Sequence, residues 1–552
     1  MTDEPLTKRL PIEPRDSNPG EINDIPNPDQ PPSEVRSKKP LAFHISFITL
    51  LAMCLLVALD ATILSVAIPV IVHELHGTTL EAFWASISFM LAMVVIQPIY
   101  TSVSNVVGRM IPLYSSFFFF IVGSIVFSVA KDMGVLILGR VLQGLGAGGL
   151  DSLNEIILAD MTTLKERPMY LGYLSIPLLG GTILGPVLGG LFSQYVTWRW
   201  IGWINLPVST VGLLLAIFFM KLKTIDLSLR EKMRRLDWGG MALFTAGCTL
   251  FASPVAWAGS MYPWPSYQTL LPLCLGAAIL VAFGFYEARP IEPVFPYRIF
   301  RSRTGCMALL ATFFHGILSY SVVQYIPLFF QAVYLDSPLQ SAIITLPFCC
   351  ISIGFAIISA IAVEVIRKYR LLIITSWVLI AVGAGVFTLL DRSSTLAAKA
   401  SFQVILAIGT GSLFSLINLP LQASLSNVDD MGLAAGILIS FRLFGGLIGL
   451  AISSTVFNSI FSASISTLGP LPDGLTILND AREAVGFIPL LGSAGATPEL
   501  LDRVIEAYRI AICAIFWMLA GMGGAGLLCS VLIKEKSLEK EELGRQQFVE
   551  TE

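Results

Sequence analysis

Fourteen apolar stretches, each about as long as a membrane-spanning helix, constrain the fold of this chain more than any other feature. Of its 552 residues, 55% are hydrophobic and 13% are charged, a balance that a water-soluble protein of this length would not tolerate. We therefore predict an all-α polytopic membrane protein. The predicted spans are residues 45–69, 84–104, 111–130, 134–157, 170–194, 199–220, 238–258, 268–287, 305–332, 339–362, 371–390, 400–424, 432–461 and 508–533.

The positive charges predict how these spans are oriented. An even number of spans puts both chain ends on one side of the membrane, and cytosolic segments are enriched in Lys and Arg. With both termini in the cytosol, the inside segments hold 26 of the 35 Lys and Arg residues and the outside connections hold seven. The remaining two, Arg140 and Arg442, lie within spans. Both termini are therefore predicted to be cytosolic.

Two basic loops divide the chain into repeated halves. Lys221 to Arg235 and Arg289 to Arg303 bracket the seventh and eighth spans and leave six spans on either side, the layout of an internal repeat. A weak repeat pairs Arg140-Val-Leu-Gln-Gly in span four with Arg442-Leu-Phe-Gly-Gly in span thirteen. We predict a disordered cytosolic tail over 1–42, an N-terminal six-helix bundle over 43–221, a two-helix insert with basic flanking loops over 222–304, a C-terminal six-helix bundle over 305–534 and a cytosolic tail over 535–552.

The longest outside connection, residues 462–507, contains a helix-start signal. Thr497 is a suitable N-cap and Pro498 suits the first helical turn. The pattern predicts a short helix that begins there. A lid and a passive loop are both open interpretations of the segment.

Span four carries a stripe of polar side chains. At 100° per residue, Gln143, Asp151 and Glu155 all fall within about 60° of Arg140. Such a stripe would be very costly against lipid, so it must face either a water-filled cavity or partner charges. We interpret it as part of a substrate or proton pathway, with a static ion-pair network as the alternative.

Other polar residues at membrane depth extend this hypothesis. Asp60 in span one is the natural counter-charge for Arg140, because both lie in the outer half of oppositely directed helices, and a carboxyl there could bind and release a proton. His315 in span nine could titrate near neutrality or serve a structural role. Gln331 and Arg442 add polar groups that either line the cavity or bridge helices.

The stretch GGTILGPVLGG, Gly180 to Gly190, predicts a flat and bent helix in span five. Gly181, Gly185 and Gly189 repeat every four residues and so share one face, over which another helix can approach closely. Pro186 removes one backbone hydrogen bond and bends the helix. We expect these residues, with Gly190, to form a hinge face at the joint between the two moving halves; a plain packing motif is the alternative.

Several kinds of site have no signal in the sequence. No Gly-rich loop with Gly-Lys-Ser/Thr, no HExxH and no GxSxG pattern is present, which argues against ATP hydrolysis and intramembrane hydrolysis by these motifs. The eight cysteines fall in apolar stretches without metal-ligand spacing. We predict no enzyme activity, no cofactor and no metal, and an ion gradient as the energy source. Most aromatic residues around span nine are expected in the core or facing lipid, but a cavity lined mainly by them would accept bulky amphipathic molecules rather than sugars.

These residues together resemble the major facilitator superfamily, specifically its fourteen-span fungal drug:proton antiporters of the toxin and multidrug efflux type. The resemblance covers about residues 43–534, and the first-span and fifth-span motifs are its specific ones. The matching segments are LDATILSVAIP (59–69), LGRVLQGLGAGG (138–149), GGTILGPVLGG (180–190), WRWIGWINLP (198–207) and LDWGG (236–240).

The resemblance implies roles for individual residues. By position, Asp60 is similar to the subfamily's first-span acid, Arg140 to the arginine implicated in proton coupling, and Gly185 with Pro186 to the helix bend that favours export. The cytosolic gate loop departs from the family pattern, because Asn105 stands where an aspartate is expected before Gly108 and Arg109. An asparagine cannot form a charged latch, although it can hydrogen-bond a helix end.

The sequence thus predicts a major facilitator fold of two six-helix bundles plus two extra central helices, working as a proton-coupled antiporter. It is expected to export hydrophobic or amphipathic small molecules such as secondary metabolites, toxins or drugs. The expected partners are substrate, protons and the lipid bilayer, without nucleic acid, and the chain is expected to act as a monomer in the plasma membrane or, alternatively, the vacuolar membrane. Proton-coupled uptake of a siderophore or other solute and a non-transporting membrane sensor are the alternative functions.

Overall fold

The computed structural model describes residues 39–538 with short gaps, and it separates into two units, Met1–Pro40 and Leu41–Glu552. Nearly all of the first unit lies outside the described residues, so the account below concerns the second unit. Of the predicted disordered tail over 1–42, residues 1–38 lie outside the described residues, and Leu41 and Ala42 begin a helix. The gaps are 65–66, 68–70, 72–73, 76–78, 164–165, 223–229, 232–233, 235, 259–261, 290–293, 296, 337, 426–429, 473, 481–483 and 494–496.

Helices make up most of the described part of the chain, and an isolated bridge between extended residues joins Ala258 to Tyr262. Thirteen helical segments among the described residues are long and apolar enough to cross a membrane. The main helices are α1 (Leu41–Thr62), α3 (Thr79–Val107), α4 (Met110–Ser128), α5 (Met133–Met161), α6 (Arg167–Tyr195), α8 (Asn205–Phe219), α10 (Trp238–Trp257), α11 (Tyr267–Tyr286), α13 (Arg303–Tyr334), α14 (Pro338–Ile366), α15 (Arg370–Phe387), α16 (Leu396–Leu416), α18 (Met431–Ser466) and α20 (Pro498–Val531).

The fourteen-span count stays a prediction, because one span is shorter than the others. Helix α10 occupies the predicted seventh span, but its described apolar stretch covers only Trp238–Phe251. The remaining predicted spans coincide with the other long helices. The short helices α7 (Trp200–Trp203) and α17 (Asn418–Ser424) complete the sixth and twelfth spans, and α12 (Tyr297–Phe300) precedes α13.

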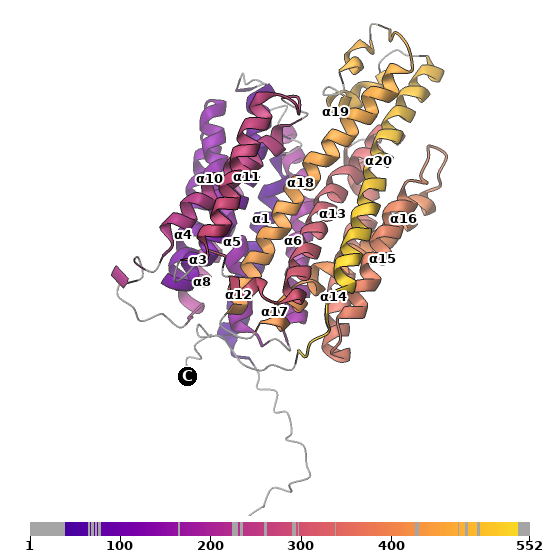
Figure 1. The fold of residues 1–552 in the computed structure, drawn as a ribbon. Coiled ribbons are helices and arrows are strands. Elements are labelled where there is room, and N and C mark those ends of the chain that lie inside the picture. The colour runs from indigo at the N-terminus through magenta and orange to yellow at the C-terminus, as the bar shows by residue number, and fades with distance from the viewer. Residues whose placement is uncertain are drawn as a thin grey trace, which may run out of the picture. The chain divides into compact units, whose positions relative to one another are not determined.

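The long helices pack into two groups. In the N-terminal half, α5 packs against α3 and α4, and α1 packs against α6 and α8. In the C-terminal half, α13 packs against α18 and α20, while α16 packs against α14 and α15. Figure 1 shows the two groups side by side, with α12 and α17 at the opposite end of the bundle from α19. The pair α10 and α11 pack together, and α10 also contacts α3 and α18, one helix of each half.

The halves meet along α6 with α14 and along α18 with α3 and α5. Small residues allow this close approach. A Cβ atom added to Gly172 of α6 would lie 3.2 Å from the Cβ of Ala360 in α14, and one added to Gly436 of α18 would lie 2.3 Å from Thr101 Oγ1 in α3. These contacts lie toward the predicted cytosolic end, where α6 and α18 begin and α3 and α14 end.

The glycine face of α6 corrects one expectation. Gly181, Gly185 and Gly189 do share a face, but it packs against α1 in the same half and does not lie at the joint between halves. A Cβ atom at Gly189 would lie 2.0 Å from the carbonyl oxygen of Ile63, so no larger residue fits without moving α1. Helix α6 runs unbroken from Arg167 to Tyr195 across Pro186, and the predicted bend stays a prediction.

The outside connection also differs from expectation. Thr497 does precede a helix, but this helix is α20 itself, which continues from Pro498 to Val531 instead of ending after a short turn. Three short helical segments precede it: η2 (Thr476–Asn479), α19 (Ala484–Phe487) and η3 (Ile488–Ser493). Segment η2 packs against α18, η3 packs against α13, and α19 packs against both short segments. Tyr508 of α20 donates a hydrogen bond to the carbonyl of Ala484 at 2.6 Å. The described residues of this connection form a packed cap on the bundle.

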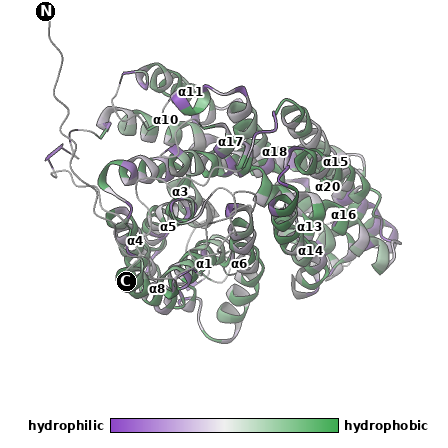
Figure 2. Ribbon diagram, turned by 90° about the horizontal axis from the view of Figure 1, so that it is seen from below, coloured by the Kyte–Doolittle hydropathy of each residue, from purple (hydrophilic) through white to green (hydrophobic). Residues whose placement is uncertain are grey.

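Hydrophobic side chains cover the outer surface of the helices as well as the core. Large apolar residues such as Phe218, Trp517 and Leu528 are more than 60% exposed, and Figure 2 shows hydrophobic residues along most of the helices. An apolar surface of this extent is expected where helices contact acyl chains. The chain is therefore a multi-pass membrane protein.

Candidate functional site

A cavity of about 250 Å³ lies between the two halves. Its walls come from α1, α3, α5 and α6 on one side and from α13, α14, α16 and α18 on the other. Most lining residues are apolar. The polar or titratable ones include Asp151, Asn154, Glu155, His315, Ser319, Tyr320, Gln324, Thr410 and Arg442.

Two carboxyls of one half face a guanidinium of the other inside this cavity. Asp151 and Glu155 lie one turn apart on α5, and Arg442 of α18 places Nη2 3.4 Å from Glu155 Oε1. Asp151 Oδ2 accepts a hydrogen bond of 2.7 Å from Gln97 of α3. Arg442 also stacks over Phe414, its Cζ lying 4.7 Å from the ring centroid.

This cluster is loosely satisfied. Glu155 Oε2 and Arg442 Nε are buried without a hydrogen-bond partner in the described part of the chain. Buried polar groups normally find partners, and open ones at a cavity wall are available to a ligand or a proton. Two carboxyls against one guanidinium also leave room for one added positive charge, which either a proton or a cationic ligand can supply.

His315 lies on the opposite wall of the cavity, on α13. Its Nε2 is 3.2 Å from the carbonyl oxygen of Thr410 and 3.2 Å from Ser319 Oγ. Nδ1 is buried and has no hydrogen-bond partner among the described residues. Nε2 thus interacts with groups of the C-terminal half, while Nδ1 has no partner among the described residues.

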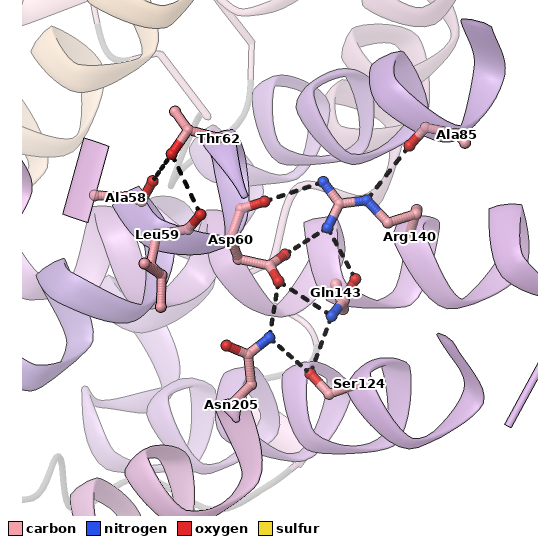
Figure 3. Close-up of polar contacts among 9 residues, drawn as sticks. All are labelled: Ala58, Leu59, Asp60, Thr62, Ala85, Ser124, Arg140, Gln143 and Asn205. Atoms are coloured by element: carbon pink, nitrogen blue, oxygen red, sulfur yellow. Dashed lines mark hydrogen bonds and ion pairs between the residues drawn. The ribbon is translucent and has the colours of Figure 1, made fainter. Parts of the chain in front are cut away.

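Asp60 and Arg140 form a second cluster, shown in Figure 3. Arg140 Nη1 lies 2.7 Å from Asp60 Oδ2, so the expected pairing is present, and both side chains are almost fully buried. Gln143 and Asn205 donate hydrogen bonds of 3.3 and 2.8 Å to Asp60 Oδ1, and both amides also reach Ser124. The cluster ties together α1, α4, α5 and α8 of the N-terminal half.

The stripe predicted along span four is therefore divided between two environments. Asp151 and Glu155 line the cavity, whereas Arg140 and Gln143 are absent from its lining and are enclosed by their own half. Asp60 balances the charge of Arg140, and the amide of Gln143 bonds within the same cluster, so neither side chain faces the cavity. Gln331 also lies away from the cavity, near the C-terminal end of α13, where it donates a hydrogen bond of 2.9 Å to Ser341 Oγ of α14.

The gate loop between α3 and α4 is held by a buried ion pair. Gly108 has φ of 104°, a conformation that favours glycine, and Arg109 Nε lies 2.8 Å from Asp160 Oδ2 near the end of α5. Arg109 also donates a 2.9 Å hydrogen bond to Ser104 Oγ. Asn105 is half-buried on α3. A salt bridge at this loop therefore exists, but Asp160 supplies its acid.

Sequence reasoning missed several residues that complete these clusters. Gln97, Asn205 and Asp160 hold Asp151, Asp60 and Arg109 respectively. Arg167 at the start of α6 donates a hydrogen bond of 2.8 Å to Gln422 in α17, which links the halves at the predicted cytosolic end. Each is a polar residue within or beside a predicted span, so the available signal was polarity at membrane depth.

The chain is similar to known transporters over most of its length. Residues 50–450 match the model of the Major Facilitator Superfamily. The chain is 45% identical over 516 residues to the MFS-type transporter sphD of Aspergillus fumigatus, a match covering 93% of this chain and 89% of that protein. It is 35% identical over 512 residues to the MFS-type efflux pump MMF1 of Pseudozyma antarctica, covering 91% and 92% respectively.

A solved structure shares the fold. The human organic anion transporter MFSD10 aligns with 89% of this chain and 100% of its own, with a TM-score of 0.55 and 13% sequence identity. At this identity the likeness concerns the helical arrangement alone. The charge clusters described above therefore lie in a fold of two helical halves with a cavity between them.

Proposed function

The chain belongs to the major facilitator superfamily, and from this membership we propose that it exports hydrophobic or amphipathic small molecules in exchange for protons. Secondary metabolites, toxins and drugs are the substrate classes meant. The similarity to an efflux pump supports the direction of transport. The observation that carries the proposal is the central cavity, which is mainly apolar yet exposes two carboxyls and one guanidinium from opposite halves.

The cavity lining supports amphipathic substrates over sugars or ions. Apolar side chains such as Met90, Leu178 and Phe348 would bury a hydrophobic body. The charged pair Glu155 and Arg442 would receive one polar end of a substrate. Most of the remaining lining is apolar, which favours a substrate with a hydrophobic body over a sugar.

Asp151 and Glu155 are the proposed exchange site for protons. With both carboxyls ionised, Arg442 balances only one of them, and a buried unbalanced charge is costly. Uptake of a proton would neutralise that charge. When the proton leaves, a cationic or hydrogen-bonding substrate would take the proton's place. Proton and substrate would thus compete for the same groups, which is the basis of antiport.

The pair Asp60 and Arg140 is proposed as the second coupling element. Protonation of Asp60 would cancel its ion pair with Arg140 and loosen the contacts that hold α1, α5 and α8 together. The glycine face of α6 lies against the same α1 helix, next to Asp60. Packing of the N-terminal half would therefore respond to the protonation state, with Gly181, Gly185 and Gly189 as the surface on which α1 and α6 shift.

One chain is proposed to be sufficient for transport, because both halves that line the cavity come from it. We place the transporter in the plasma membrane, where expelled molecules leave the cell, and propose that it has no catalytic activity of its own. Fluorescence microscopy of a tagged chain would distinguish the plasma membrane from the vacuolar membrane. The mass of the purified, active particle would test the monomer.

The proposal is tested with purified protein in sealed vesicles without ATP. A panel of labelled amphiphiles and ferric chelates is followed with and without an imposed pH gradient. We expect an amphiphile to move against the proton flow, with transport abolished by a protonophore and reduced at least tenfold in Asp151→Asn and Glu155→Gln. Glu499→Gln, at the exposed start of α20, is the matched control and should transport normally. Chelate movement with protons would establish an importer, and absence of any gradient-driven flux would refute transport.

A further inference from the structure

A second cavity, of about 600 Å³, lies between the α10–α11 pair and the C-terminal half. We call it the aromatic pocket. It has no part in the transport proposal above, because none of its lining residues lines the central cavity. Six phenylalanine side chains from four helices and the α11–α12 connection are part of its wall: Phe244, Phe283, Phe295, Phe300, Phe441 and Phe444.

The phenylalanine rings form one continuous cluster. Phe244 lies 5.5 Å from Phe283 and 5.4 Å from Phe295, measured between ring centroids. Phe300 extends the cluster toward α18, with its centroid 6.5 Å from that of Phe441. Stacked and tilted rings of this kind offer both an apolar surface and the negative faces that attract cations.

One carboxyl lines this apolar pocket. Glu287, directly after α11, is only 3% exposed, and its Oε2 accepts a 3.2 Å hydrogen bond from the backbone N–H of Phe295. Its Oε1 is buried without a hydrogen-bond partner among the residues described. The pKa of Glu287 is raised to about 7, mainly by burial and also by nearby Asp237, while the hydrogen bond from Phe295 lowers it.

Among the described residues, the neighbouring charge that acts on Glu287 is another acid. Asp237 lies close by and caps α10 by accepting a 2.8 Å hydrogen bond from the N–H of Gly240. Neither Asp237 nor Glu287 forms an ion pair within the described ranges. A buried acidic oxygen without a donor, in a pocket of aromatic faces, is suited to a positively charged nitrogen.

The pocket opens toward the bilayer. Tyr297 and Leu310, which line it, are 52% and 39% exposed. Gly284, another lining residue, faces open space, because a Cβ atom added there would meet no atom within 4 Å. A ligand can therefore reach Glu287 from the lipid phase at the predicted cytosolic end of α11.

We propose that the aromatic pocket binds an amphipathic amine, with its protonated nitrogen on Glu287 and its apolar body among the phenylalanine rings. A plain acyl chain would fill the pocket but leave the acidic oxygen without a donor, which disfavours it. A lipid with an amine head group and a dissolved lipophilic amine share the required chemistry. Since α18 carries Phe441 and Phe444 on this pocket and Arg442 on the central cavity, a bound amine would rest against the helix that presents Arg442.

The test uses the full chain in nanodiscs of phosphatidylcholine, which has no amine proton to donate. The probe is a long-chain primary amine bearing a diazirine, whose photolabelled peptides are identified by mass spectrometry. We expect saturable labelling of peptides from α11 and α18. Glu287→Gln should weaken the apparent affinity at least tenfold, as loss of a charged hydrogen bond predicts. Gly284→Leu should fill the pocket and abolish labelling.

Two matched variants control for altered folding. Glu499→Gln repeats the acid-to-amide change on an exposed turn, and Gly521→Leu repeats the glycine change at another site with open space around it on α20. Both should be labelled like the unmodified chain. Thermal stability of all four variants shows whether each is folded, and labelling does not depend on transport.

Competition identifies the source of the amine. Displacement of the probe by phosphatidylethanolamine, but not by phosphatidylcholine, would assign the pocket to a lipid head group, and displacement only by soluble amines would assign it to a solute; either supports the proposal. Equal displacement by an uncharged long-chain alcohol, or unchanged affinity in Glu287→Gln, would overturn it. Labelling that persists in Gly284→Leu would also overturn it, because the site would then lie elsewhere.

Discussion

Buried charges in this protein occur in three different states of compensation. Asp60 is paired with Arg140 at 2.7 Å and accepts hydrogen bonds from two amides. Glu155 lies farther from its partner, 3.4 Å from Arg442, and Glu287 has no ionic partner in the described sequence. A fully compensated charge is suited to holding helices together, whereas an incompletely compensated one is open to a proton or ligand. The degree of compensation therefore separates scaffold from candidate binding groups.

Removing the charge of Asp60 should lower the stability of the protein and impair proton-driven transport, and a second substitution separates these two effects. Asp60→Asn leaves the buried guanidinium of Arg140 without its counter-charge, so we expect a loss of about 3–5 kcal/mol in stability. Replacing Arg140 by Met as well removes the stranded charge and should restore much of the thermal stability. If the pair couples protons, the double variant should remain defective in pH-driven flux. Normal flux in that stable double variant would show that the pair is structural.

The Glu287 carboxyl should make stability depend on pH. Because its pKa is raised to about 7, the folded state holds this proton more tightly than the unfolded chain does. The stabilising contribution is complete at pH values below the ordinary glutamate pKa and is lost as pH rises through about 7. The melting temperature of the wild type, measured from about pH 5 to about pH 8, should fall more than that of Glu287→Gln. Parallel curves would contradict the burial of an ionisable Glu287.

At the scale of the helix, α5 shows what a polar stripe can and cannot predict. Helical periodicity correctly placed Arg140 and Glu155 on one side of the helix. These residues are fifteen positions apart, or about 22 Å along the axis, so different neighbours meet the same face. Asp60 and Phe89 contact Arg140, while the cavity borders Glu155. Periodicity gives the direction of a side chain, and only the packing of other helices gives its surroundings.

The glycine face of α6 should tolerate no added methyl group. Gly189→Ala would bring a Cβ atom to 2.0 Å from the carbonyl oxygen of Ile63, so α1 must move, at a cost of about 1–3 kcal/mol. Gly180→Ala, on the same helix, meets open space and should be neutral or slightly stabilising. Thermal unfolding of the two variants in one detergent compares them directly. Equal stability would mean that α1 and α6 are not tightly packed there.

For the whole molecule, apolar length predicted the long helices, and the basic loops fall on either side of the α10–α11 pair, as expected. The interface between the halves could not be predicted in the same way, because in lipid it depends on small residues such as Gly172 and Gly436, which also occur within each half. The outside cap was equally inaccessible: Thr497 signals where α20 begins, but not that the helix continues through the membrane. Local sequence signals specify helix ends, whereas contacts between distant segments depend on how well the surfaces of the two segments pack together.

Joining the halves covalently should stop transport. Gly172 of α6 and Ala360 of α14 lie at the predicted cytosolic end, and their Cβ atoms would be 3.2 Å apart, close enough for a disulfide after a small adjustment. In a chain whose exposed Cys274 and Cys350 are replaced by Ser, oxidation of Gly172→Cys with Ala360→Cys should fix α6 to α14. The cavity then cannot open to the cytosol, so flux should fall at least tenfold and return on reduction.

The matched control joins two helices of the same half. Gly523 of α20 and Ala381 of α15 would have Cβ atoms 3.3 Å apart, so the same cysteine pair forms a similar bond without linking the halves. Oxidation of this control should leave transport intact, because α15 and α20 move together when one half turns against the other. Full activity of the oxidised Gly172→Cys and Ala360→Cys variant would mean that α6 and α14 do not separate during the cycle. Inhibition of both pairs would instead indicate motion within the C-terminal half.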